Sequence, residues 1–394
     1  MQWTDLRLGD AVEIRHGYAF EGALFTDMLG YPTLVTPGNF DIGGGWKDAK
    51  PKTYSGEPPD GYVLEPGALL VTMTDLSRAT DTLGLPAIVP ADGRTYLHNQ
   101  RIGKVLVTDP TRVQLEFLGY YLRVAHYRQY VVGSATGSTV KHTSPSRILD
   151  FVARVPPISA QQAIAEVLGA LDDKIAANER IVLLADELMR CRYAALPGDS
   201  RVLGEVAAQV RDQLAPDAVD PQTKYVGLEH LPRRRAWAAD SGRAADVTSA
   251  KSSFLPKDVL FGKLRPYFHK VVSAGTPGIC STDILVIRAK DSRLSGLILA
   301  AVSSDETIAR VSAATEGTRM PRTNWKDLSA TSVRWPSEEK ARNFSVEVQD
   351  LSESMHQVVA ESAQLARTRD ELLPLLMSGK LRVQDVEKTV EDLL

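Results

Sequence analysis

Two long stretches of the chain carry the hydrophobic periodicity of amphipathic helices. In each stretch, which follows a proline, apolar residues recur at alternating spacings of four and three, the heptad pattern of a coiled-coil seam. The first seam contains Ile164, Leu168, Leu171, Ile175 and Val182, and the second, which starts 180 residues later, contains Phe344, Val348, Leu351, Met355 and Val358. Each stripe is narrow, so we expect the two helices to pair with each other as an antiparallel coiled coil.

The segments that precede the two helices resemble each other. Leu8-Gly9-Asp10 recurs as Leu203-Gly204-Glu205, and Thr136-Gly137-Ser138 recurs as Glu316-Gly317-Thr318. Such self-similarity indicates two copies of one structural unit. The prediction is therefore an α+β fold with two pseudo-repeated globular domains and two long helices. The predicted ranges are 1–155 for the first domain, 156–200 for the first helix, 201–335 for the second domain, and 336–394 for the second helix and tail.

Composition is that of an ordinary globular protein. The 394 residues carry 46 Lys+Arg and 49 Asp+Glu, a net charge of −3, which excludes a wholly basic nucleic-acid binder. Charge is unevenly spread, because residues 201–335 contain 20 Lys+Arg against 14 Asp+Glu, or +6. The charged opening of the chain and the absence of a long apolar run lead us to expect a cytoplasmic protein without a membrane span.

The sequence lacks the usual signatures of enzymes that use nucleotides or metals. Each Gly-Lys is followed by Val or Leu and not by the Ser or Thr of a phosphate-binding loop, as in Gly262-Lys263-Leu264. The two cysteines, Cys191 and Cys280, form no zinc motif, and the seven histidines lack metal-ligand spacing. We therefore expect no cofactor, no metal and no catalytic residue on this chain.

A cluster of cations and aromatics in the second domain is the best candidate for contact with an anionic partner. Arginine and lysine bind phosphates and guanine edges, so a nucleic acid is the partner that this cluster favours. The candidates in the second domain are Lys251, Lys263, Arg265, Tyr267, His269, Lys270, Arg319 and Arg322. The looser equivalents in the first domain are Arg15, His16, Arg78, His98, Gln100, Arg101 and Lys141. The alternative interpretation is a solvated charged face with Tyr267 and Phe268 in the core.

Several stretches resemble the specificity subunits of type I restriction-modification systems. They include the run from Phe254 to Tyr267, the segment Tyr225-Val226-Gly227-Leu228-Glu229-His230, and the junction from Val155 to Leu168 that leads into the first helix. Leu372-Leu373-Pro374-Leu375-Leu376-Met377-Ser378-Gly379-Lys380-Leu381 is similar to the C-terminal end of that family. The resemblance covers essentially the whole chain, although Pro336-Ser337-Glu338-Glu339-Lys340 departs from the first junction.

This resemblance implies a non-catalytic subunit with two target-recognition domains. Each domain would read one half of a bipartite DNA target, and the two helices would set the gap between the halves. Methyltransferase subunits, two per chain, would dock on it and would bind S-adenosylmethionine. A separate restriction subunit is a further expected partner.

Two other classes of function stay open from the sequence. A coiled-coil adaptor that binds only proteins would explain the helices but not the +6 balance of residues 201–335. An enzyme in its own right would need motifs that the chain lacks. Nucleic-acid binding by the purified chain, measured against salt concentration, discriminates among these classes.

Overall fold

The computed structural model describes residues 2–28, 30–77, 79–238, 240–314 and 320–391. The chain forms two compact units, and each is described by itself. The first consists of residues 1–172 with 368–394, and the second of residues 173–367. Mixed helix and strand content agrees with the predicted α+β class. The division falls inside both long helices, whereas the predicted domain ranges place each helix outside the globular parts.

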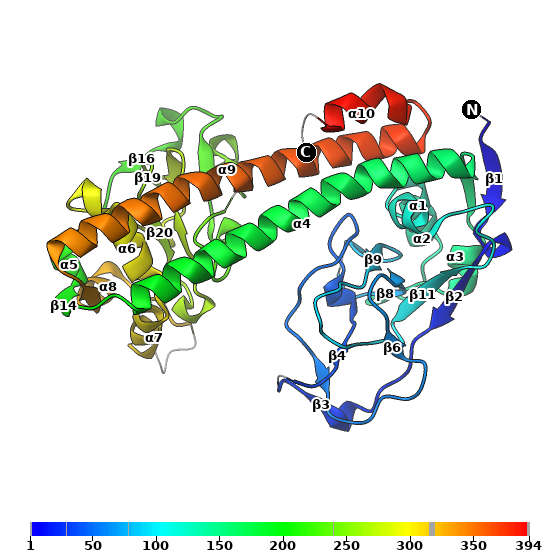
Figure 1. Ribbon diagram of the computed structural model, residues 1–394, viewed down its shortest axis with the longest axis horizontal. Helices are drawn as coiled ribbons and strands as arrows, with labels where there is room; N and C mark the ends of the chain where they lie inside the picture. Colours follow the sequence, from blue (N-terminus) through cyan, green and yellow to red (C-terminus); the bar gives the residue numbers. More distant parts are fainter. Residues whose placement is uncertain (1, 29, 78, 239, 315–319, 392–394) are drawn as a thin grey trace. The chain divides into compact units, whose positions relative to one another are not determined.

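The first unit is built around two sheets (Figure 1). One has the order β2-β11-β7-β9, formed by β2 (Val12–His16), β11 (Ile102–Val107), β7 (Leu69–Thr72) and β9 (Pro86–Ile88). The other has the order β3-β5-β4-β10-β6, formed by β3 (Phe25–Thr26), β5 (Thr53–Tyr54), β4 (Thr33–Leu34), β10 (Tyr96–Leu97) and β6 (Val63–Leu64). Two short pairs join β1 (Thr4–Arg7) to β13 (Val152–Val155) and β8 (Thr74–Asp75) to β12 (Lys141–His142). The short helices are α1 (Leu115–Tyr121), α2 (Ala125–Gly133) and α3 (Pro145–Leu149).

The second unit repeats this plan. Its first sheet has the order β15-β23-β20-β21, formed by β15 (Ala207–Val210), β23 (Ile284–Ala289), β20 (Val259–Gly262) and β21 (Val271–Ser273). Its second sheet has the order β16-β19-β22-β17-β18, formed by β16 (Gln213–Leu214), β19 (Lys251–Phe254), β22 (Gly278–Cys280), β17 (Lys224–Val226) and β18 (Gly242–Arg243). β14 (Asp199–Val202) pairs with β24 (Ser332–Trp335), and the short helices are α5 (Leu203–Val206), α6 (Ser295–Val302), α7 (Asp305–Ala313) and α8 (Trp325–Ser329).

Equivalent backbone contacts recur in both units at the offsets read from the sequence. The Thr143 amide donates to the Met73 carbonyl at 3.0 Å, and the Thr323 amide donates to the Lys263 carbonyl at the same distance. Leu8 likewise donates to Phe151, and Leu203 to Thr331. These bonds lie at the ends of equivalent strands, so the sequence repeat is a repeat of structure.

Two long helices contribute to both units: α4 (Ile158–Ala194) and α9 (Glu338–Met377). In the first unit, Leu168 and Leu376 are fully buried in one hydrophobic cluster. Complete burial of such a side chain contributes about 2 kcal/mol to stability. Figure 1 also shows α10 (Val383–Glu391) beside the end of α9, and Val386 joins the same cluster. The predicted single range 336–394 therefore contains two helices.

In the second unit, α4 and α9 run antiparallel. The Asn178 side-chain amide donates to the Glu361 carboxylate at 2.6 Å, and the Arg192 guanidinium pairs with Glu347 at 2.7 Å. Residue numbers thus rise along α4 as they fall along α9. The seam residues Val182, Phe344, Val348 and Met355 are buried, whereas Ile175, Leu351 and Val358 are half-buried. Asn178 is itself 3% exposed, so its bond to Glu361 fixes which residues face each other.

Candidate nucleic-acid interface

The second unit presents its cations and aromatics on the loop that follows strand β20. A short 3-10 helix, Pro266–Phe268, is flanked by Arg265 and His269, which adopt left-handed backbone conformations with φ of 52° and 53°. These conformations are uncommon for residues other than glycine and cluster at functional sites. The Arg265 amide donates to the Pro321 carbonyl at 2.7 Å, so a distant segment holds this loop in place.

Four side chains of this loop region form what we term the arginine–aromatic surface: Arg233, Arg265, Tyr267 and Phe268. The Arg233 guanidinium lies 3.8 Å from the centre of the Phe268 ring, and the Tyr267 ring packs edge-on against Phe268 at 4.9 Å. Arg233, Arg265 and Tyr267 are exposed. The two guanidinium groups stay available to phosphates or base edges, while the aromatic ring fixes the orientation of one of them. Tyr267 is therefore not a core residue, which answers the alternative interpretation for this position.

Helix α4 holds the backbone of the segment Arg233-Arg234-Arg235 in place. Asp186 on α4 is 1% exposed; its carboxylate accepts a hydrogen bond from the Ala236 amide at 3.0 Å and pairs with Arg190. The Arg190 guanidinium also donates to the carbonyl of Arg234 at 3.3 Å. Arg234 in turn pairs with Asp305 at 2.9 Å. The backbone that carries Arg233 is thus held from the helix side.

The buried Asp186 carboxyl should make stability depend on pH. Burial raises the pKa of Asp186 to about 6, and its ordinary value is about 4. The folded chain then binds an extra proton in this window, so the free energy of unfolding falls as pH rises from about 4 to 6. Asn at this position keeps an acceptor for Ala236 but does not titrate. Between pH 4 and 7 the natural chain should lose about 2 kcal/mol relative to D186N in urea unfolding. If the difference in the free energy of unfolding between the natural chain and D186N does not change with pH, the raised pKa of Asp186 is contradicted.

Three side chains of the second unit that were predicted to contact DNA instead interact with other parts of the protein. His269 is 3% exposed, its Nε2 lies 2.8 Å from the Ser303 carbonyl, and burial lowers its pKa to about 4. The ammonium groups of Lys263 and Lys270 donate to the carbonyls of Thr282 and Leu228. His269 is therefore removed as a DNA contact, and the two lysines act first as supports of neighbouring loops.

The remaining candidates of the second unit lie near the same sheets. Arg322 is exposed, pairs with Asp283 and forms a backbone bridge to Leu264. Lys251 is half-buried; its ammonium donates to the Ser249 hydroxyl at 2.6 Å and lies 5.9 Å from the Tyr225 ring. Arg322 thus adjoins the loop of Arg265, whereas Lys251 belongs to the other sheet. Arg319 and, in the first unit, Arg78 lie outside the described residues.

In the first unit, candidate residues meet where β2 and β11 adjoin. His16 is paired with Gly103 across these strands, and the Gln100 amide donates to the Tyr18 carbonyl at 2.9 Å. The exposed side chains here are Arg15, His16, Tyr18, Gln100 and Arg101. Arg15 is engaged with Glu13 at 2.8 Å. This region therefore offers mixed hydrogen-bonding groups and less free positive charge than the arginine–aromatic surface.

Tyr18 was not predicted as part of this region. It is 38% exposed, and its backbone is held by a hydrogen bond from its amide to the His98 carbonyl at 2.8 Å. The preceding Gly17 permits this approach, because a Cβ there would lie 2.1 Å from the Asn99 carbonyl oxygen. The sequence signal for such a site is the glycine followed by an aromatic residue, which is weak on its own.

Of the other two candidates in the first unit, His98 is buried and Lys141 is half-buried. His98 is 3% exposed, its Nε2 lies 2.9 Å from the Ile102 carbonyl, and burial lowers its pKa. It supports the loop from inside and is removed as a DNA contact. Lys141 is half-buried and pairs through its backbone with Asp75 in the β8–β12 ladder. Beside it, the His142 Nδ1 lies 3.2 Å from the Thr74 hydroxyl.

Comparisons with known proteins agree with this architecture. Residues 1–183 match the family model of the type I restriction modification DNA specificity domain. The specificity subunit of the type I restriction enzyme EcoBI from Escherichia coli is 26% identical over 234 residues, which cover 58% of this chain and 43% of that protein. The EcoDI specificity subunit from Escherichia coli is 25% identical over 279 residues, which cover 59% of this chain and 62% of that protein. The matches thus span less than two thirds of either relative.

A solved structure gives a likeness of fold. The S subunit of a type I restriction-modification system from M. genitalium superimposes with a TM-score of 0.57, and the alignment covers 95% of this chain and 96% of that chain at 14% identity. At this identity the likeness concerns the fold alone.

The fold defines a class of α+β proteins in which two similar sheet units share two long helices. The sequence of residues 1–183 is similar to the type I restriction modification DNA specificity domain, and the fold is similar to that of a solved S subunit. Among the residues that the structure describes, no helix is long and apolar enough to cross a membrane. The same described residues contain no group of three or more His, Cys, Asp or Glu side chains placed to hold a metal ion.

Proposed function

We propose that this chain selects the DNA sequence on which a type I restriction-modification complex acts. Each unit carries a target-recognition domain, spanning residues 1–155 and 201–335, that reads one half of a bipartite target. The α4 and α9 helices form an antiparallel coiled coil that sets the gap between the halves. The chain itself is non-catalytic and cytoplasmic. Methyltransferase subunits, two per chain, dock on it and bring S-adenosylmethionine, and restriction subunits join the same complex.

The arginine–aromatic surface is the observation that carries this proposal. Two exposed guanidinium groups, Arg233 and Arg265, come from two different loops and lie near the same Phe268 ring, in the segment with a net charge of +6. Guanidinium groups bind phosphates and make bidentate bonds to guanine. In the first unit, Arg15 and His16 lie in β2 and Gln100 and Arg101 lie just before β11, and they supply a second, chemically different set of groups. Two different sets favour two different half-targets.

Binding of the full chain to random-sequence duplex DNA tests this function against that of a protein-only adaptor. We expect measurable affinity that falls at least about tenfold when salt rises from about 50 to 200 mM, because phosphate contacts release counterions. Selection of bound duplexes should then enrich a defined sequence. Absence of binding at low salt would favour the adaptor.

A further inference from the structure

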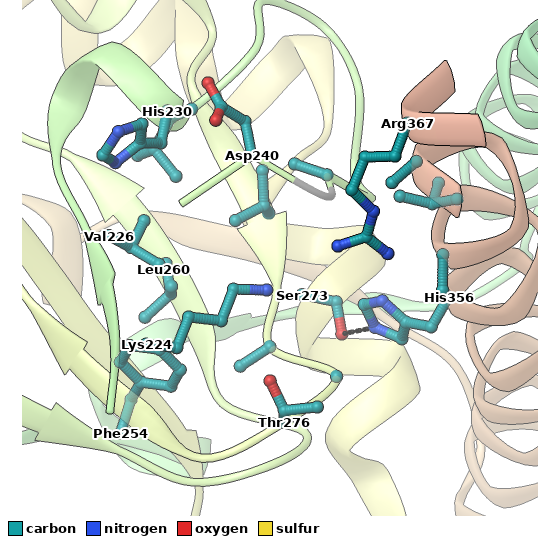
Figure 2. Close-up of a pocket in the computed structure, with 18 residues that line it drawn as sticks. Lys224, Val226, His230, Asp240, Phe254, Leu260, Ser273, Thr276, His356 and Arg367 are labelled. Carbon is teal, nitrogen blue, oxygen red and sulfur yellow. Dashed lines mark hydrogen bonds between the residues drawn. The ribbon is translucent and has the colours of Figure 1, made fainter. Parts of the chain in front are cut away.

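A hollow in the second unit lies beside the face of α9, away from the arginine–aromatic surface. Its volume is about 260 Å³, and it is lined by strands β17, β19, β20 and β21 on one side and by α9 on the other (Figure 2). The lining is largely apolar, with Val226, Phe254, Leu260 and Val272 on the strands and Val359 on the helix. A hollow with apolar walls and a few polar groups is typical of a small-molecule site.

Two cations point into this hollow from opposite sides. Figure 2 shows the Lys224 ammonium and the Arg367 guanidinium directed toward the same space. Within the described residues, no hydrogen bond or ion pair of either side chain is found. Burial lowers the pKa of Lys224, which reflects the cost of keeping this half-buried charge without a close partner. Arg367 is exposed, whereas a half-buried charge such as Lys224 is normally paired, so an anion beside Lys224 and within reach of Arg367 would be stabilised.

The other polar groups of the hollow compensate these cations only in part. The Asp240 carboxylate lies at its edge and, in Figure 2, is directed away from Lys224; its negative charge raises the pKa of Lys224, but burial has the larger effect. His356 on α9 places its Nε2 3.5 Å from the Ser273 hydroxyl, and burial lowers its pKa to about 4, so the ring is neutral at physiological pH. The Thr276 hydroxyl also lines the hollow. Neutral hydrogen-bonding groups therefore lie beside two positive charges, of which Lys224 is compensated only in part, by Asp240.

We propose that this hollow binds a small organic anion, with its carboxylate or phosphate head group between Lys224 and Arg367 and its apolar body against Phe254 and Val272. The volume is just below the range of ordinary ligand pockets, which limits the ligand to roughly ten non-hydrogen atoms. A phosphate of the DNA backbone is the competing occupant. The apolar walls favour the organic anion, because a backbone phosphate has no apolar body to cover them.

Calorimetric titration of the full chain with four probes tests the chemistry. Phenyl phosphate and phenylacetate have the proposed head groups and body, benzyl alcohol lacks the charge, and inorganic phosphate lacks the body. We expect saturable binding of at least one organic anion with a dissociation constant below about 1 mM. Benzyl alcohol and inorganic phosphate should each bind at least about tenfold more weakly, since each lacks one of the two interactions.

Variants locate the site. Lys224→Gln and Arg367→Gln should each weaken binding of the organic anion about tenfold or more. Lys326→Gln and Arg180→Gln remove matched exposed cations of the same unit and should leave it unchanged. Ala360→Phe, at an exposed lining position on α9, should block the hollow while both cations remain. Circular dichroism of each variant verifies that it is folded.

Four results would overturn the proposal. The first is that neither organic anion binds saturably, and the second is that benzyl alcohol binds as tightly as the organic anions. The third is that Lys224→Gln and Arg367→Gln, in folded variants, leave binding of the organic anion unchanged. The fourth is that duplex DNA displaces the bound probe and that inorganic phosphate binds as well as that probe. The last would assign the hollow to the DNA backbone. None of these results bears on sequence selection by the arginine–aromatic surface, which is measured separately.

Discussion

Replacing Arg233 and Arg265 together by alanine should relax recognition in one half of the DNA target and leave the other half intact. The two guanidinium groups belong to one surface of the second unit and are exposed, so their loss removes contacts without opening the core. Each lost base contact costs about 1–3 kcal/mol, so the combined loss of preference in that half should be about 100-fold. Sequencing of duplexes selected by the variant measures the preference at each position.

The matched control is Arg180→Ala, which removes an exposed arginine from α4, and it should leave both halves unchanged. Uniform weakening of both halves by the double variant would mean that these arginines contact phosphates only. An unchanged preference would contradict the role of the arginine–aromatic surface in base readout.

Lengthening both long helices by one heptad should lengthen the gap between the two half-targets. The contacts Asn178–Glu361 and Arg192–Glu347 place residues 176–182 of α4 opposite residues 357–363 of α9. Duplicating both segments repeats a facing pair, including the Asn178–Glu361 bond, and keeps the apolar seam continuous. Each helix then gains about 10 Å at about 1.5 Å per residue. At about 3.4 Å per base step, the gap should increase by about three base pairs.

The bases of the two half-targets should not change in this variant, because no residue of 1–155 or 201–335 is altered. Duplication of residues 176–182 in α4 alone is the control, since it removes the facing partners and should destabilise the helix pair. Selection of the original gap by the doubly lengthened chain would contradict the role of the helices as a spacer, as would new half-target bases.

The long helices could be predicted from sequence because their pattern is local. Heptad spacing depends only on which residues are apolar, and Leu168, Leu171, Val348 and Met355 are buried as that spacing requires. The repeat was equally visible, since the equivalent bonds Thr143–Met73 and Thr323–Lys263 follow from offsets in the sequence. What the pattern did not reveal is α10, which follows α9 after Gly379, a residue at φ +70°.

The site residues could be predicted only in part, because their use depends on distant backbone. From sequence alone, a lysine or histidine within a run of cations is the kind of residue that contacts DNA. Yet Lys263 donates to the carbonyl of Thr282, and His269 lies against that of Ser303. No local pattern shows where such carbonyls lie after folding. Arg265 and Tyr267 remain exposed because Pro266 is buried between them.

The central claim is that one chain reads two separate DNA sequences at a fixed distance. The most direct measurement is selection of bound duplexes from a random library by the full natural chain, followed by sequencing. We predict two short blocks of specified bases separated by a constant number of unspecified base pairs. A single uninterrupted block, or two blocks at variable distances, would contradict it.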